Sequence, residues 1–274
     1  MNQWTDDHYI PDQHNAHIDT SEFQAELARL AKGRMGAELD DANLEHQIVD
    51  LVLGRLSNEL EQPPDDTLIC RYLSVTKFLW FIQDFSVYLG SARAFEDPTD
   101  CAIPADYNNC AQSFFHNRGV APIVWDDFTE RVRAQWLVSS WTEVANHHDD
   151  YLLWHRYAGG VFGVGITVRY RDICELLKQE SKRQALTHFS YGKVSYGSPL
   201  RIPPFTKRRI FRNEREVRFA CRGEALAAVQ MSLLPIRDRI GLRFSPDAPL
   251  HHVDAIRQTW MNWGGSDRYQ IAGD

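Results

Sequence analysis

The spacing of apolar residues predicts helices near the start of the chain. In residues 21–32, Phe23, Leu27 and Leu30 recur at helical spacing and fall on one face. Residues 41–56 repeat this amphipathic pattern. We expect the two helices to pack on the rest of the protein or on a partner protein.

The pattern changes after Pro63-Pro64, where proline and acidic residues interrupt the helical spacing. Short strands and helices are expected from there onward. The predicted strands are 67–72, 85–91, 138–141, 162–170, 193–196, 217–221 and 239–244, and the predicted helices are 74–83, parts of 107–136, 149–157, 173–177 and 251–263.

These elements do not follow a regular β-α-β order, which would indicate a parallel sheet. The predicted fold class is therefore α+β, with a mixed, mostly antiparallel sheet and flanking helices. The predicted organisation is an acidic arm with two helices at residues 1–66, followed by an α+β body at residues 67–274.

Charge separates the two parts. Residues 1–66 contain 15 acidic and 4 basic residues, whereas the remaining 22 acidic and 26 basic residues leave the body at +4, for a net charge of −7. The longest apolar run, Phe78–Ile82, is far shorter than the roughly 20 residues of a membrane span. No secretory signal is recognised at the start, so we expect a cytoplasmic protein without membrane partners.

The five cysteines are scattered and form no C-x-x-C pair, so the sequence predicts neither a disulfide framework nor a cysteine-rich zinc site. The densest basic cluster is Lys207-Arg208-Arg209 with Arg212. It could bind a nucleic acid, a nucleotide or the acidic arm. In the last case the arm would be autoinhibitory.

Four blocks occur in a fixed order along the body. They are Arg71-Tyr72-Leu73-Ser74 with Tyr88-Leu89-Gly90-Ser91 and Phe95-Glu96-Asp97-Pro98; Ser140-Trp141 with Tyr151-Leu152-Leu153-Trp154-His155-Arg156-Tyr157; the run from Lys207 to Arg218; and the run from Ile240 through Pro246-Asp247-Ala248-Pro249 to Trp260.

Over about residues 67–265, these blocks resemble the prokaryotic "domain of unknown function 2971" family. The chain departs from that pattern at Leu153, where methionine is usual, and at Ser139, where a cysteine often precedes the tryptophan. The resemblance implies a bacterial protein and fits a stress or phage-defence setting. It implies no mechanism.

The segment Glu214–Arg218 carries the most chemistry. If it is extended, Glu214, Glu216 and Arg218 point to one face of a strand. Two neighbouring carboxylates can split their pKa values, which suits acid–base catalysis or the stabilisation of a cationic transition state. The alternative is a solvated face or a carboxylate–arginine pair that braces the fold.

Arg71 lies in an apolar strand beside Tyr72, and a buried guanidinium needs a partner. That partner is either a ligand phosphate, a carbonyl group or a carboxylate such as Asp97, Asp100 or Glu216.

Ser140 and Trp141 place a hydroxyl and a large ring at a strand end. Trp154 and Tyr157 are three residues apart on a predicted helix and offer aromatic surface for a nucleobase or nicotinamide. Core packing is the alternative for both rings, and we favour it for Trp154.

An arginine, a serine and a glutamate in this order are similar to the arrangement in arginine/serine/glutamate ADP-ribosyltransferases. The similarity implies that Arg71 holds the phosphates of NAD and that Ser140 supports the nicotinamide ribose. It also implies that Glu216, with Glu214 in support, faces the positive charge that builds on the sugar.

The leading hypothesis is thus a nucleotide- or NAD-processing enzyme, either a transferase or an NAD glycohydrolase, with NAD as candidate substrate and no metal. The expected ligand-binding residues are Tyr72, Ser140, Trp141, Trp154, Tyr157, Lys207, Arg208 and Arg218, and the expected catalytic residues are Glu216, Glu214 and Arg71. The alternatives are a non-catalytic nucleotide- or partner-binding module and a metal-dependent nuclease built on Asp97, Asp100 and Glu216.

Overall fold

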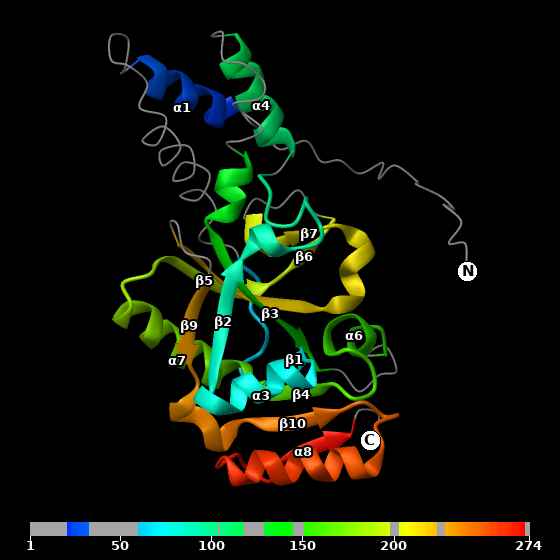
Figure 1. The fold of residues 1–274 in the computed structure, drawn as a ribbon. Helices are drawn as coiled ribbons and strands as arrows, with labels where there is room; N and C mark the ends of the chain where they lie inside the picture. The colour runs from blue at the N-terminus through cyan, green and yellow to red at the C-terminus, as the bar shows by residue number, and fades with distance from the viewer. Residues whose placement is uncertain are drawn as a thin grey trace, which may run out of the picture.

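The computed structural model describes residues 21–32, 60–103, 105–117, 129–144, 151–197, 203–223 and 228–271 (Figure 1). Its strands are β1 (Leu68–Leu73), β2 (Ser86–Ser91), β3 (Trp136–Glu143), β4 (Val164–Arg169), β5 (Thr187–Lys193), β6 (Ser195–Tyr196), β7 (Thr206–Lys207), β8 (Glu216–Arg222), β9 (Ala228–Ser232), β10 (Gly241–Phe244) and β11 (Tyr269–Ile271). Its α-helices are α1 (Ser21–Lys32), α3 (Val75–Asp84), α4 (Ala105–His116), α6 (Tyr151–Leu153), α7 (Tyr170–Arg183) and α8 (Leu250–Asn262).

Short tight helices complete the described chain. They are the π-helical turn η3 (Trp154–Ala158) and the 3-10 helices η1 (Ala92–Ala94), η4 (Pro203–Phe205), η5 (Arg209–Glu214) and η6 (Leu234–Arg239).

Nine strands of the described chain form one sheet in the order β11-β10-β4-β1-β3-β2-β9, with β8 and then β5 on the other side of β3. All neighbouring strands in this sheet are antiparallel except β10 and β11. The predicted class, α+β with a mostly antiparallel sheet, is confirmed.

The sheet forks at β3. Strand β1 pairs with the end of β3 at Thr142 and Glu143, whereas β2 pairs with its beginning at Leu137 and Val138. Strands β1 and β2 therefore meet the same edge of β3 and leave residues 139–141 between them. Strand β8 pairs with β3 along its full length on the opposite edge.

The main core lies on one face of the sheet under α3, α7 and α8. Side chains at alternate positions of β3 and β8, such as Leu137 and Phe219, point into it. Trp260 of α8 packs on the rings of Phe81 and Phe85, with centroids 6.2 and 5.3 Å apart. Because strand residues alternate between faces, the residues between them point to the opposite face.

Local signals explain why α3 forms where it does. Ser74 precedes the helix, and its hydroxyl accepts a hydrogen bond from the backbone N–H of Lys77. The helix ends at Asp84, and the left-handed backbone of the next residue, Phe85 (φ 48°), turns the chain directly into β2.

Most predicted elements are present, including a helix at Ser21–Lys32, which packs beside α4 (Figure 1). The predicted helix at 41–56 lies outside the described residues. The sequence pattern predicts neither β9 nor β11, which lie at two edges of the sheet.

The residues just before the predicted boundary at residue 66 are bonded to the body. The backbone N–H of Lys193 donates to the carbonyl of Glu61 (2.8 Å), and that of Arg171 donates to the carbonyl of Asp65 (3.1 Å). Gln62 contacts Tyr170 and the carbonyl of Tyr191. Residues 60–66 thus form a strap across β5 and the start of α7.

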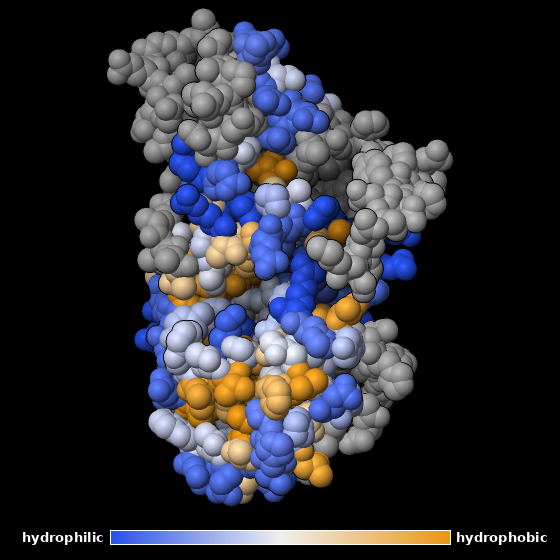
Figure 2. All heavy atoms as spheres, turned by 45° about the vertical axis from the view of Figure 1, so that its right-hand side comes forward, coloured by the Kyte–Doolittle hydropathy of each residue, from blue (hydrophilic) through white to orange (hydrophobic). Residues whose placement is uncertain are grey.

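The surface is unevenly apolar. In the view of Figure 2, apolar residues gather in the lower part of the surface, below a largely hydrophilic middle part. Large exposed apolar side chains include Trp80 of α3, at 61% exposure, and Leu250 of α8, at 72%. Within the part of the chain that is described, no helix has the length and apolar character needed to cross a membrane.

Candidate functional site

A cleft of about 430 Å³ lies on the face of β3 and β8 opposite to the main core. The pairing of Ser140 with Arg218 and of Thr142 with Glu216 points these side chains to that face. Nine of the eleven predicted site residues line the cleft: Arg71, Tyr72, Ser140, Trp141, Tyr157, Lys207, Glu214, Glu216 and Arg218. Three segments that are far apart in sequence therefore converge here.

Arg218 is the centre of a buried ionic network. Its guanidinium donates to both oxygens of Glu216 (2.7 and 3.0 Å) and to both oxygens of Asp100 (2.7 and 2.8 Å). It also donates to the carbonyl of Pro204 at 2.9 Å. Only 1% of Arg218 is exposed, and its buried charge is paired with carboxylates, as such burial requires.

Glu216 remains ionised in this setting. Burial alone would raise the pKa of its carboxyl group, but the charges of Arg218 and Lys207 oppose burial. Hydrogen bonds from Arg218 and from the Ser140 hydroxyl lower the pKa further, to about 2. The group therefore acts as a fixed negative charge at neutral pH and cannot serve there as a proton donor.

Lys207 bridges the carboxylates of the cleft. Its ammonium lies 2.6 Å from Glu214 Oε2, 3.2 Å from Glu216 Oε2 and 3.7 Å from Asp100 Oδ2. Burial lowers the pKa of this ammonium, but the charges of Glu216 and Glu214 outweigh burial and raise it above its ordinary value. Lys207 is thus an internal cation of the cleft, and its ammonium pairs with carboxylates of the body.

Glu214 reaches the cleft by a route that the sequence did not predict. It ends the 3-10 helix η5, and Arg215 then adopts a left-handed backbone (φ 43°) before β8 begins. The prediction that Glu214, Glu216 and Arg218 share one strand face is therefore wrong for Glu214 and correct for the other two.

Tyr157 and Arg156 bind Glu214 from the opposite wall. The Tyr157 hydroxyl donates to Glu214 Oε1 at 2.7 Å, and Arg156 Nη1 lies 3.4 Å from the same oxygen. Burial and the adjacent carboxylate raise the pKa of Tyr157. This hydroxyl therefore stays protonated and works as a hydrogen-bond donor.

Arg71 fills the fork between β1 and β2. Its guanidinium donates to Ser139 Oγ on β3 (2.7 Å) and to the carbonyl of Tyr88 on β2 (3.4 and 3.3 Å). The predicted ion pair with Asp97, Asp100 or Glu216 is wrong, and the carbonyl alternative is correct. Desolvation lowers the pKa of Arg71 to about 10, so it remains a cation at neutral pH.

Two predicted site residues do not line the cleft. Trp154 is 1% exposed and packs edge-on against Tyr72 in a small core, with ring centroids 4.8 Å apart. Arg208 is directed to Asp97, with Nη2 2.9 Å from Oδ2. The core-packing alternative for Trp154 is therefore correct.

Trp141 lines the cleft but directs its ring into the main core, edge-on to Phe219. Its indole N–H donates to Ser139 Oγ at 3.1 Å, so this hydroxyl oxygen accepts hydrogen bonds from both Trp141 and Arg71. The aromatic surface expected from Trp141 and Trp154 is thus largely used inside the protein.

Sequence reasoning missed Phe211 and Phe95 as aromatic members of the site. The charged groups of Lys207, Arg208 and Arg156 lie 4.8, 5.3 and 5.0 Å from the ring centroid of Phe211. Phe95 similarly lies beside Arg218, 5.5 Å away. In the sequence, Phe95 and Phe211 were marked only by their positions inside two of the four ordered blocks described above.

The acidic residues proposed for a nuclease metal site already hold cations from the protein. Asp100 and Glu216 clamp Arg218, and Asp97 binds Arg208 and Thr99. Across the described ranges, no group of three His, Cys, Asp or Glu side chains is arranged to hold a metal ion.

The cleft therefore combines five basic and five acidic side chains, so its lining carries no net charge. The cations could meet phosphates, Glu216 could face a positive charge, and Phe95, Phe211 and Tyr157 supply ring surface. Comparison with protein-family models, curated proteins and solved structures gave no significant match.

Proposed function

We propose that the cleft binds a nucleotide-type ligand, with NAD as the candidate, and that the protein breaks the bond between the ribose C1′ and the nicotinamide nitrogen. The observation that carries this proposal is that Arg71, Ser140 and Glu216, from three distant segments, line one cleft. An ADP-ribosyltransferase-like transferase and an NAD glycohydrolase both require this bond cleavage.

The charge state of Glu216 supports the assignment. A pKa of about 2 means that the carboxylate is negative throughout the physiological range. Cleavage at C1′ builds positive charge on the sugar ring and needs a fixed anion rather than a proton shuttle. Ser140, which donates to Glu216, orients this anion from the neighbouring strand.

In this proposal, the cations that line the cleft bind the phosphates of the ligand. Arg71 has five N–H donors, and its bonds to Ser139 and Tyr88 leave donors for a phosphate. Lys77 and Arg156 are the other lining cations, and both are exposed, although Arg156 also pairs with Glu214. Tyr157 and Phe211 offer ring faces for the base.

The reaction balances without a redox partner. The C1′–N bond breaks, and its electron pair leaves with neutral nicotinamide. Water or an acceptor hydroxyl forms the new C1′–O bond and releases one proton to solvent. Glu216 stabilises the charge that appears between these events and is unchanged at the end.

The direct test is to incubate the protein with NAD and to measure nicotinamide release. We expect Glu216→Gln to reduce the rate about hundredfold or more, because the substitution removes a preorganised charge from the transition state. Glu143→Gln is the matched control, since Glu143 lies at the end of the same β3 ladder but is not among the cleft residues. NAD binding by both variants, measured by calorimetry, separates lost chemistry from lost structure. Full release by Glu216→Gln would remove this residue from the mechanism.

A second candidate is a module that binds a nucleotide without turnover. The supporting observation is that cations of the protein already pair with both glutamates, Glu216 with Arg218 and Lys207, and Glu214 with Lys207 and Arg156. This candidate predicts saturable NAD binding with no nicotinamide released. The same experiment therefore distinguishes the two.

A further inference from the structure

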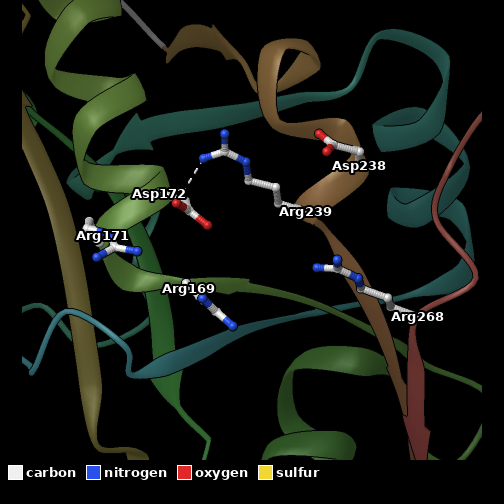
Figure 3. A pocket seen from close by; sticks show the side chains of 6 residues that line it. All are labelled: Arg169, Arg171, Asp172, Asp238, Arg239 and Arg268. Carbon is white, nitrogen blue, oxygen red and sulfur yellow. Dashed lines mark hydrogen bonds and ion pairs between the residues drawn. The ribbon is translucent and has the colours of Figure 1, made fainter.

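A second cavity, of about 320 Å³, lies at the far end of β4 from the cleft described above. Its lining comes from three segments: the junction of β4 and α7, the end of η6 and the residues before β11. The six lining residues are Arg169, Arg171, Asp172, Asp238, Arg239 and Arg268 (Figure 3).

The cavity has a strong excess of positive charge. Four arginines face two aspartates, which leaves a net charge of +2 in a chain whose total is −7. Asp172 engages Arg239, with Arg239 Nη1 3.0 Å from Asp172 Oδ1. Within the described ranges, the side chains of Arg169, Arg171 and Arg268 form no ion pair.

Figure 3 shows the four arginines around one space, with Arg268 on one side and Arg169, Arg171 and Asp172 on the other. Arg268 extends from the β11 side toward the middle of the view, and Arg169 and Arg239 flank that space from β4 and η6. Asp172 orients the guanidinium of Arg239. Like charges gathered in one cavity repel each other, and a multivalent anion relieves that repulsion.

The residue types indicate the kind of anion. All four cations are arginines, whose planar N–H fork matches the oxygens of a phosphate group and can donate two bonds at once. The lining contains no aromatic residue, so it offers no ring on which a nucleobase could stack.

We propose that this cavity is a second anion site, and that it binds a small phosphate anion such as pyrophosphate or the terminal phosphates of a phosphate ester. The acidic chain as a whole disfavours a nucleic-acid backbone, which binds through extended positive surface. The site is independent of the nucleotide cleft, because the two share no lining residue.

Calorimetric titration of the whole protein with pyrophosphate tests the proposal, with Arg171→Gln and Arg268→Gln as variants. We expect each variant to bind about tenfold more weakly, because each loses a charge-assisted hydrogen bond to the anion. Lys178→Gln is the matched control, since it removes an exposed charge from the same α7 without touching the cavity. The arginines are exposed, so the thermal midpoint of unfolding should stay at the wild-type value.

Pyrophosphate binding that is unchanged in both arginine variants would place the anion elsewhere and overturn the proposal. If Lys178→Gln lost as much pyrophosphate affinity as the arginine variants, the effect would come from the overall charge of the protein, and this result would also overturn the proposal. Inorganic phosphate and a short single-stranded oligonucleotide are the other titrants. Binding of the oligonucleotide through these arginines, without pyrophosphate binding, would replace the small anion with a nucleic acid.

Discussion

At the scale of single residues, Arg218 unites the stability of the fold with the chemistry of the cleft. Its guanidinium lies between Asp100 and Glu216, and all three groups are at least 95% buried. Such a cluster contributes little net stability compared with an apolar core of the same volume. Removing only one member, however, leaves an unpaired charge in the interior.

Arg218→Leu is therefore expected to lower the free energy of unfolding by about 3–5 kcal/mol, because Asp100 and Glu216 lose their shared partner. Urea unfolding followed by circular dichroism measures this change. Arg208→Gln breaks a more exposed pair with Asp97 and should cost less than about 1 kcal/mol. Equal costs for the two variants would contradict the assignment of Arg218 as the centre of the network.

The depressed pKa of Glu216 makes stability depend on pH in a defined window. In the folded protein the pKa is about 2, against an ordinary value of 4.5, so the unfolded chain takes up the proton first as pH falls. The ionised carboxylate contributes of the order of 3 kcal/mol to the free energy of unfolding, and this contribution is fully present above pH 4.5. It is lost as the pH falls toward 2.

In the wild-type protein, the free energy of unfolding should decline as the pH is lowered from about 6 to about 3. Glu216→Gln should have a shallower slope, since glutamine does not titrate. Identical slopes in the two proteins would mean that other carboxylates account for the acid sensitivity.

At the scale of elements, tight contacts fix the wall of the cleft that carries Tyr157. Gly163 follows the turn after η3, and a Cβ added there would lie 2.2 Å from the Cβ of Ala158 and 2.7 Å from its carbonyl oxygen. Ala158 ends the π-helical turn to which Tyr157 belongs. Only a glycine allows β4 and η3 to approach this closely.

Gly163→Ala is expected to destabilise the protein by about 1–3 kcal/mol, because the methyl group overpacks this contact. It should also weaken ligand binding by displacing Tyr157. Thermal unfolding and NAD calorimetry measure the two effects. Gly90→Ala is the control, since a Cβ at Gly90 meets nothing within 4 Å, and its effect should stay within about 0.5 kcal/mol.

The elements that the sequence predicted well are those with a regular apolar period and clear ends. Ser74 caps α3, and Val217, Phe219 and Cys221 alternate into the core along β8. Prediction failed where a single backbone conformation decides the outcome. The left-handed turn at Arg215 removes Glu214 from the strand, and arginine carries no signal for such a turn.

At the scale of the whole molecule, the order of Arg71, Ser140 and Glu216 along the chain suggested a shared site, and the three residues line one cleft. The pairing of Glu216 with Arg218 agrees with the predicted alternative of a carboxylate–arginine pair that braces the fold. The partners of Arg71 and the role of Asp100 were not predictable, because they depend on the fork at β3 and on the loop that holds Asp100. Net charge was equally uninformative: the body's +4 conceals a balanced cleft and a separate arginine-rich cavity.

The fork has a consequence for how this protein could be altered. Where β1 and β2 diverge, the backbone ladder is interrupted, and one guanidinium bonds instead to a carbonyl on one strand and to a hydroxyl on another. Arg71 also lines the cleft. Ligand affinity and folding stability are therefore coupled at Arg71. A substitution of Arg71 that is meant to change ligand specificity must also replace the hydrogen bonds that Arg71 makes to the two neighbouring strands.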